Sequence, residues 1–350
     1  MENGRERVVV CLEYATGGGG YEDPTVLSAD GAFLREGAAM LRAVVADLKT
    51  LPGIRPVVLC DVRWSPGDMA GASLRKVSSL ADLTSEWLAA AHTAHALMLI
   101  APECGGTLAR WTEMAEDAGG RLWTPGSQFV RLASDKQATA EWLARGGVAV
   151  PRGRRLEGGE AFPDDVPYPA VLKPIDGAGS LDLRWLPSPP LAERVPERPG
   201  GWRLEEFRAG RAASVLVCGS GETPITLPAS WQRLSDDGTW HYLGGTTPIP
   251  EPWQTRARNL ALQAARVLPP THGFFGFDLV LGEAEDGGDD VVIEVNPRLT
   301  TSYIGVRRVL GVNPLRLVAE PAVAGQLAEN WRDLTGVLPV DFGPGQALDA

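Results

Sequence analysis

The stretch VVIEVNPR, residues 291–298, restricts the fold of this 350-residue chain more than any other. Its apolar residues predict a buried β-strand, yet Glu294 and Asn296 stand two positions apart within it. Side chains two apart on a strand project from the same face, so the carboxylate and the amide would point the same way. A carboxylate in apolar surroundings costs several kcal/mol unless a partner compensates it. The strand therefore predicts a polar partner on that face.

A second acid, Asp278, interrupts another apolar run, FFGFDLVLGE at 274–283. The segment EDGGDD at 285–290 suits an exposed turn, so the two runs are predicted to form a hairpin. On adjacent antiparallel strands Asp278 and Glu294 can lie side by side on one face. Asp, Glu and Asn oxygens are donors that Mg²⁺ takes, with phosphate oxygens and water completing its shell. The structural alternative is a buried ion pair between Glu294 and Arg298 or another arginine.

The first part of the chain alternates between strand-like and helical patterns. Strands are predicted for VVVCLEY (8–14), PVVLCDV (56–62) and HALMLIAPE (95–103), and a helix for FLREGAAMLRAVVADLKTL (33–51). This alternation predicts an α/β domain with an open, mainly parallel sheet.

The pattern changes after a predicted helix in SDKQATAEWLARGGVAVPRG (134–153), which has Ser134 as its expected N-cap and a glycine stop. Short β-like pieces follow, with a helix predicted for 253–268. After about residue 335 the periodicity is lost, and a loose tail is predicted.

Composition excludes several classes of function. A net charge of −11 argues against general affinity for nucleic acid or for an anionic membrane. No stretch approaches the about 20 apolar residues that cross a bilayer, and the N-terminus does not resemble a signal peptide, so a cytoplasmic location is expected. Neither a disulfide framework nor a zinc site is predicted from the four scattered cysteines, Cys11, Cys60, Cys104 and Cys218.

Three further features are weak when taken singly. Lys173 ends the strand-like YPAVLKP and precedes a small-residue loop with Gly177, Gly179 and Ser180, where an ammonium and loop amides could reach phosphates. Lys136 opens a helix, and RLEEF (203–207) puts two acids at a strand end. Each is more often a solvated surface feature.

Together, the ordered set of Lys136, Lys173 with its glycine loop, Glu205-Glu206-Phe207, Asp278 and Glu294-x-Asn296-x-Arg298 resembles the ATP-grasp superfamily over roughly residues 121–320. The resemblance implies two α+β subdomains that close on ATP, after an α/β domain that helps to bind substrate. The expected boundaries are an N-terminal domain at 1–120, an ATP-grasp domain at 121–335 with a small β-rich subdomain at about 150–208, and a tail at 336–350.

The resemblance also implies roles for individual residues. Lys136 and Lys173 would hold ATP phosphates under a flap formed by 177–180. The adenine hinge would run from Glu205 to Arg208, through Glu206 and Phe207, with the Glu205 carboxylate and backbone groups facing the base. Asp278, Glu294 and Asn296 would bind Mg²⁺, for which Mn²⁺ could substitute, and Arg298 would steady the transferring phosphoryl group. One departure concerns ribose, because Ala212 stands where many relatives have a carboxylate.

More narrowly, EYATGGG, REGAAML (35–41), IAPECGGTL (100–108), SDKQATAEWL and HYLGGTTPIP (241–250) resemble the tyramine–glutamate ligase branch, whose members join an amine to a glutamate carboxylate. The implied reaction is an ATP-dependent carboxylate–amine ligation through an acyl phosphate, with small-molecule acid and amine as partners. Substrate is expected near Glu13, Glu103, Thr301 and Tyr303. By analogy a homodimer is one expectation.

Other nucleotide-binding families fit the sequence less well. Asp341-Phe342-Gly343 spells a kinase metal triplet, but no H-R-D loop precedes it, and neither a P-loop nor G-x-G-x-x-G is present. The alternatives left open are an ATP-binding regulatory protein without turnover and an ATP-grasp ligase for a different amino acid or peptide.

Overall fold

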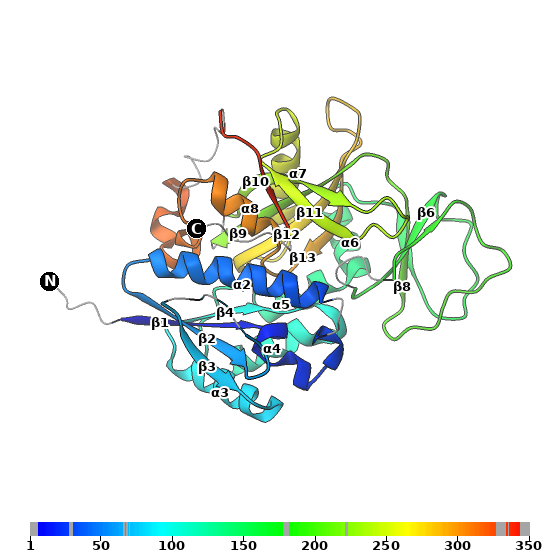
Figure 1. Ribbon diagram of the computed structural model, residues 1–350. Helices are drawn as coiled ribbons and strands as arrows, with labels where there is room; N and C mark the ends of the chain where they lie inside the picture. The colour runs from blue at the N-terminus through cyan, green and yellow to red at the C-terminus, as the bar shows by residue number, and fades with distance from the viewer. Residues whose placement is uncertain are drawn as a thin grey trace.

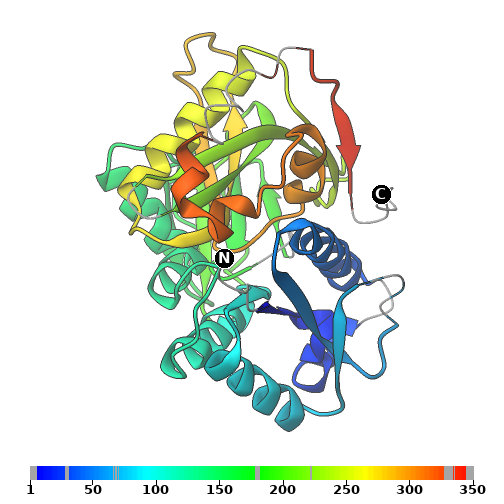
Figure 2. The ribbon, with the colours of Figure 1, turned by 90° about the vertical axis from the view of Figure 1, so that its left-hand side faces the viewer.

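The computed structural model describes residues 6–27, 31–65, 67, 69, 71–177, 182–220, 223–326, 334 and 336–343. Three of the predicted flap residues, Ala178, Gly179 and Ser180, therefore lie outside the described residues. Figures 1 and 2 both show the N-terminal part, blue to cyan, as a layer beneath the rest of the molecule. A small green lobe with β6 and β8 projects to one side in Figure 1.

The N-terminal part is built on a four-stranded parallel sheet, in the order β3-β2-β1-β4. Its strands are β1 (Arg7–Glu13), β2 (Ile54–Asp61), β3 (Ser73–Val77) and β4 (Ala96–Ile100). Its helices are α1 (Tyr14–Gly17), α2 (Ala32–Thr50), α3 (Leu80–Thr93) and α4 (Thr107–Asp117), with short 3₁₀ turns at Gly19–Tyr21, Pro24–Leu27 and Cys104–Gly106. The parallel α/β architecture predicted from the alternating patterns is confirmed.

The largest sheet has six antiparallel strands in the order β13-β12-β9-β10-β11-β14. They are β9 (Arg211–Ser220), β10 (Ile225–Leu234), β11 (Tyr242–Thr247), β12 (His272–Leu281), β13 (Val291–Asn296) and β14 (Val340–Phe342). A core that includes Phe277, Leu143 and Ala261 joins one face of the sheet to α5 (Ser127–Ser134), α6 (Lys136–Arg145) and α7 (Trp253–Val267).

A second core is shared between this sheet and the N-terminal layer. It brings Phe274 of β12 together with Leu48 of α2 and Ile304 of α8 (Ser302–Val309). The remaining short helices are α9 (Arg316–Ala319) and a 3₁₀ turn at Pro321–Val323. Because one apolar core continues through α2, the two parts are packed together over a wide area.

The projecting lobe is a four-stranded antiparallel sheet in the order β5-β8-β6-β7. Its strands are β5 (Gly153–Leu156), β6 (Ala170–Pro174), β7 (Arg184–Leu186) and β8 (Trp202–Glu206). It has a small core of its own, which includes Leu172 and Leu204.

The predicted hairpin is present and has the register on which the metal prediction depends. In the pairing of β12 with β13, Asp278 stands opposite Glu294 and Gly276 opposite Asn296. The register shifts directly after Asp278, which is typical of a β-bulge.

Two local predictions were wrong. The N-cap of α6 is Asp135, whose carboxylate accepts a hydrogen bond from the Ala138 amide, whereas Ser134 ends α5 and donates to the Val130 carbonyl. The tail is not wholly loose, because Val340–Phe342 pairs with β11 as an edge strand and Phe342 is buried. Among the helices of the described part, none has the length and apolarity to cross a membrane.

Candidate active site

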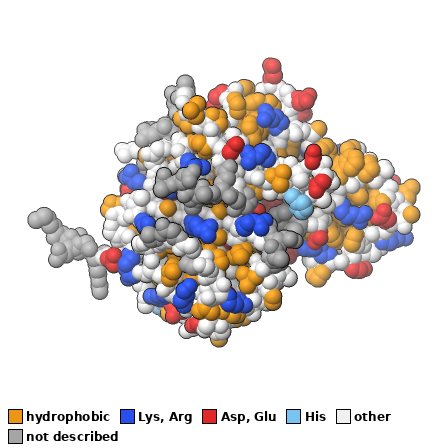
Figure 3. Space-filling view, viewed as in Figure 1, with side chains coloured by type: hydrophobic (Ala, Val, Ile, Leu, Met, Phe, Trp, Pro, Cys, Tyr) orange, Lys and Arg blue, Asp and Glu red, His pale blue; other side chains and the backbone are white. Residues whose placement is uncertain are grey.

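A cleft with a volume of about 330 Å³ opens between the small sheet, the large sheet and α2. Most of the predicted site residues line it: Lys173, Glu205, Glu206, Phe207, Arg208, Asp278, Glu294, Asn296, Arg298 and Thr301. Residues that are more than a hundred positions apart in the sequence therefore share one cavity. On the face of the molecule shown in Figure 3, acidic and basic side chains are interspersed.

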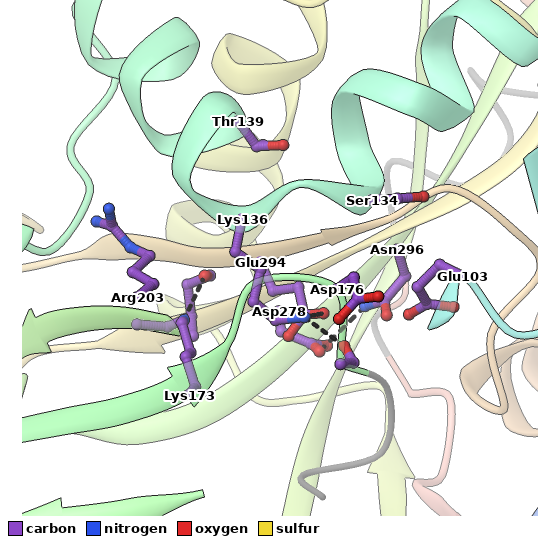
Figure 4. Close-up of polar contacts among 12 residues, drawn as sticks. Glu103, Ser134, Lys136, Thr139, Lys173, Asp176, Arg203, Asp278, Glu294 and Asn296 are labelled. Carbon is purple, nitrogen blue, oxygen red and sulfur yellow. Dashed lines mark hydrogen bonds and ion pairs between the residues drawn. The ribbon is translucent and has the colours of Figure 1, made fainter. Parts of the chain in front are cut away.

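The acidic pair on the hairpin forms one wall of the cleft. Asp278 accepts hydrogen bonds from the Gln232 side chain at 2.8 Å and from the Asn296 amide nitrogen at 3.0 Å. Burial, together with the neighbouring Glu294 carboxylate, raises the pKa of Asp278 to about 6. Figure 4 shows Asp278, Glu294 and Asn296 gathered in one place. Asp278 thus lies beside a second carboxylate and, within the described part of the chain, forms no ion pair of its own.

This donor set fits a divalent cation that is shared with phosphates. Within the described ranges, no group of three His, Cys, Asp or Glu side chains forms a complete metal cage. Mg²⁺ is usually bound by one or two carboxylates together with substrate phosphates and water, so two carboxylates and an amide oxygen suffice. A cation here would also relieve the repulsion that raises the pKa of Asp278.

Lys136 lies next to Glu294, the second member of the acidic pair. Its ammonium forms an ion pair with Glu294 at 2.7 Å and donates a hydrogen bond to the Gly177 carbonyl. Burial alone would lower the pKa of Lys136, but the Glu294 carboxylate raises it above its usual value. The alternative ion pair for Glu294 is therefore formed with a lysine, not with an arginine.

Lys173 belongs to a buried ionic group at the base of the small sheet. Its ammonium contacts Glu205 at 2.5 Å and donates to the Ile293 carbonyl at 3.2 Å. Arg203, two residues before Glu205 on β8, contacts the other carboxylate oxygen at 2.7 Å. The carboxylate of Glu205 is thus held by two cations, although the family resemblance implied that it would face adenine. Arg203 was missed, and its same-face spacing with Glu205 was the available signal.

The hinge segment offers a flat aromatic surface. The backbone amides of Glu206 and Phe207 donate hydrogen bonds to the carbonyls of Arg152 and Pro169, respectively, each at 2.8 Å. The Phe207 ring stacks on Trp240, with 5.8 Å between centroids and 14° between planes. Trp240 lines the cleft as well and was not predicted, because it lies in the loop between β10 and β11.

Arg298 joins the cleft to the N-terminal layer. Its guanidinium contacts the Glu103 carboxylate at 2.8 and 3.4 Å, and the Glu103 side chain is only 2% exposed. Burial opposes the charge of Arg298, yet Glu103 raises the pKa of Arg298 above its usual value. Glu103 therefore contacts a residue that lines the cleft, Arg298, without lining the cleft itself. Thr301 lines the cleft directly.

Like Glu103, two further predicted substrate residues do not line the cleft. Glu13 is buried and accepts hydrogen bonds from the amides of Ala15 and Thr16 at 3.1 and 2.8 Å, so it caps α1. The ring of Tyr303 is fully buried, and its hydroxyl donates to Asp47 at 2.5 Å. Both side chains serve the fold, because their polar atoms are satisfied within the protein. Ala212 lines the cleft and supplies no group for ribose.

Two family models match consecutive parts of the chain. Residues 54–130 match the pre ATP-grasp 3 domain, and residues 133–302 match the ATP-grasp domain. The second range contains every residue of the acidic pair, the hinge and the two lysines.

Known relatives are distant. A D-alanine–D-alanine ligase from Desulforudis audaxviator is 31% identical over 191 residues, which cover 48% of this chain and 60% of the relative. A tyramine–L-glutamate ligase from Methanocaldococcus jannaschii is 22% identical over 309 residues, which cover 86% of this chain and 85% of the relative. The chain spans less than two thirds of the length of the first curated relatives that it matches.

Solved structures confirm the fold. The crystal structure of an ATP-grasp superfamily protein from Archaeoglobus fulgidus superimposes with a TM-score of 0.67 at 23% identity, covering 89% of this chain and 88% of that one. The two domain models that match residues 54–130 and 133–302, together with this superposition, show that the chain belongs to the ATP-grasp superfamily.

Proposed function

We propose that this protein is an ATP-dependent ligase that joins a carboxylic acid to an amine through an acyl phosphate. The observation that carries the proposal is the pairing of Asp278 with Glu294 on the wall of a cleft that also contains Lys173 and Arg298. Two carboxylates suit a magnesium-bound triphosphate, and the cations beside them suit the charge that develops on phosphoryl transfer.

Each residue of the cleft has a chemical role in this scheme. Asp278, Glu294 and Asn296 would hold Mg²⁺ or Mn²⁺, which when bound neutralises phosphate charge. Lys173, which now contacts Glu205, would exchange some of this contact for one with the phosphates. Lys136 would hold Glu294 in position. The Phe207–Trp240 stack would border the adenine, and Arg298 would bind the transferring phosphoryl group.

The reaction needs no protein nucleophile. A carboxylate oxygen of the acid attacks the γ-phosphorus, the bond to the β–γ bridging oxygen breaks, and ADP leaves. The amine nitrogen then attacks the acyl carbon, phosphate leaves, and the amine loses a proton. The chain contributes positioning, charge and exclusion of water, which is how phosphoryl-transfer sites accelerate their reactions.

The relatives suggest the class of substrates. D-alanine–D-alanine ligase and tyramine–L-glutamate ligase are named for small amino acids and an amine, so small molecules of this kind are the proposed partners. We also propose a cytoplasmic location, where ATP and such substrates are available.

The test is ADP release with a panel of acids and amines, including L-glutamate, D-alanine and tyramine. The proposal predicts that ADP release depends on the correct acid, and that hydroxylamine added with that acid gives a hydroxamate from the acyl phosphate. Wild-type protein without acid and the Glu294→Gln variant are the controls. Binding of ATP without acid-dependent turnover across the panel would instead support a regulatory ATP-binding protein.

A further inference from the structure

Glu36 of α2 faces the cleft from the N-terminal layer. Among the described residues that line the cleft, it alone comes from the first 120 positions. Arg298, Tyr242 and Thr301 border the same cleft from the ATP-grasp part. Glu36 therefore lies at the end of the cleft where substrate, and not the nucleotide hinge, would be placed.

The carboxylate of Glu36 differs from the other acids around Arg298. Glu13 is held by backbone amides, and Glu103 is paired with Arg298 itself. The carboxylate of Glu36 is half-buried, but within the described part of the chain it forms no side-chain hydrogen bond or ion pair. Burial raises the pKa of Glu36 above its ordinary value, while the charges of Arg298 and Arg35 act in the opposite direction. An acceptor of this kind gains most from a cationic partner.

The backbone around Glu36 is fixed by the next residue. Gly37 packs so closely on Glu13 that a Cβ at this position would lie 2.2 Å from a carboxylate oxygen. Glycine therefore lets α2 pack directly against the end of β1, one residue away from Glu36. Glu36 thus directly precedes a glycine whose backbone is packed against Glu13.

We propose that Glu36 binds the ammonium group of the amine substrate and thereby selects a cationic amine. The inference rests on the proposed ligase function and assigns the amine-binding end of the same cleft. Arg298, which borders the same cleft, suits the acid or its acyl phosphate, so the two substrates would be held by opposite charges. Each charge would also repel the wrong substrate from its end of the cleft.

The experiment compares Glu36→Gln with wild type in the ligase assay, with tyramine as the cationic amine and hydroxylamine as a largely uncharged nucleophile at neutral pH. Glu86→Gln is the matched control, because Glu86 lies on α3 of the same domain and pairs with exposed Arg75. We expect the Glu36→Gln variant to raise the KM for tyramine about tenfold or more, the usual effect of losing a charged hydrogen bond. The rate of hydroxamate formation should stay within about twofold of wild type, and the Glu86→Gln variant should behave as wild type.

The outcomes separate this inference from the proposed function. An unchanged KM for tyramine in Glu36→Gln, with normal hydroxamate formation, would overturn the role of Glu36 and leave the ligase proposal standing. Failure of the wild-type protein to form any hydroxamate would overturn the ligase proposal itself. If Glu36→Gln does not fold, Glu36→Ala also removes the charge, and an unchanged KM for tyramine in that variant would equally contradict the inference.

Discussion

At the scale of single residues, the site is organised by buried charges that each require a partner. Glu294 pairs with Lys136, Glu205 with Lys173 and Arg203, and Glu103 with Arg298. Removing one member of such a pair leaves an uncompensated charge and costs about 3–5 kcal/mol. The same pairs hold the side chains at the cleft in defined positions.

The sequence predicted which residues would gather here better than it predicted their contacts. The alternation of Glu294 and Asn296, with a turn before them, was enough to place Asp278 opposite Glu294. The partnership of Glu205 with Lys173 and Arg203 depends on the register of two strands in the small sheet, which no short pattern encodes.

Glu13 gives a prediction at this scale. Burial raises the pKa of Glu13 from 4.5 to about 7 in the folded protein. The folded state then keeps a proton that the unfolded state releases, so stability should fall as pH rises through this window and level off above it. At about 1.4 kcal/mol per pKa unit, the free energy of unfolding should fall by on the order of 3 kcal/mol across this range.

The measurement is the free energy of unfolding of wild type and Glu13→Gln at several pH values across that window. The glutamine cannot ionise, so the stability of wild type relative to the variant should decline as pH rises. A difference between the two proteins that stays constant with pH would show that the pKa of Glu13 is not raised.

At the scale of elements, long periodic segments were predictable and short pieces were not. The helix predicted at 33–51 is α2 (Ala32–Thr50), and the helix predicted at 253–268 is α7 (Trp253–Val267). Strand β14 has only three residues, too few for a period of two to be recognised, and it forms because β11 offers an open edge. Phe342 then fills space left by Gly245 and Gly305, where a Cβ would lie 2.5 and 2.2 Å from its ring.

We therefore expect Phe342→Ala to lower the free energy of unfolding by about 3–5 kcal/mol, as loss of a buried aromatic side chain usually does. Leu338→Ala is the control, because Leu338 is 80% exposed just before the strand. Chemical denaturation of both variants checks this. Equal, small effects would mean that the end of the chain is loose, as the sequence suggested.

At the scale of the whole molecule, α2 links the N-terminal layer to the large sheet. Asp47 on α2 accepts a hydrogen bond from Tyr303 and forms an ion pair with Arg307, both of α8, with an Arg307 nitrogen at 2.6 Å. Asn313 adds a hydrogen bond to the Asp47 carbonyl at 2.7 Å. These contacts join residues more than 250 positions apart, and Tyr303 was assigned to substrate because nothing local in the sequence reveals such a partner.

Replacement of Asp47 by Ala should destabilise the protein by about 3–5 kcal/mol, because it leaves Arg307 and Tyr303 without their partner. A double-mutant cycle with Arg307→Ala should give a coupling energy above about 1 kcal/mol. Asp117→Ala, at the exposed end of α4, is the control and should change stability by less than about 0.5 kcal/mol. Additive effects of the Asp47 and Arg307 changes would mean that this contact does not join the two parts.

The most direct test of the account is calorimetric titration of ATP into wild type and Glu294→Gln, each with Mg²⁺ and with the metal chelated. The account predicts that Mg²⁺ strengthens ATP binding to wild type by about tenfold or more, and that this gain is largely lost in Glu294→Gln, while metal-free binding changes little. The same gain from Mg²⁺ in both proteins would contradict a metal-bound nucleotide at Asp278, Glu294 and Asn296.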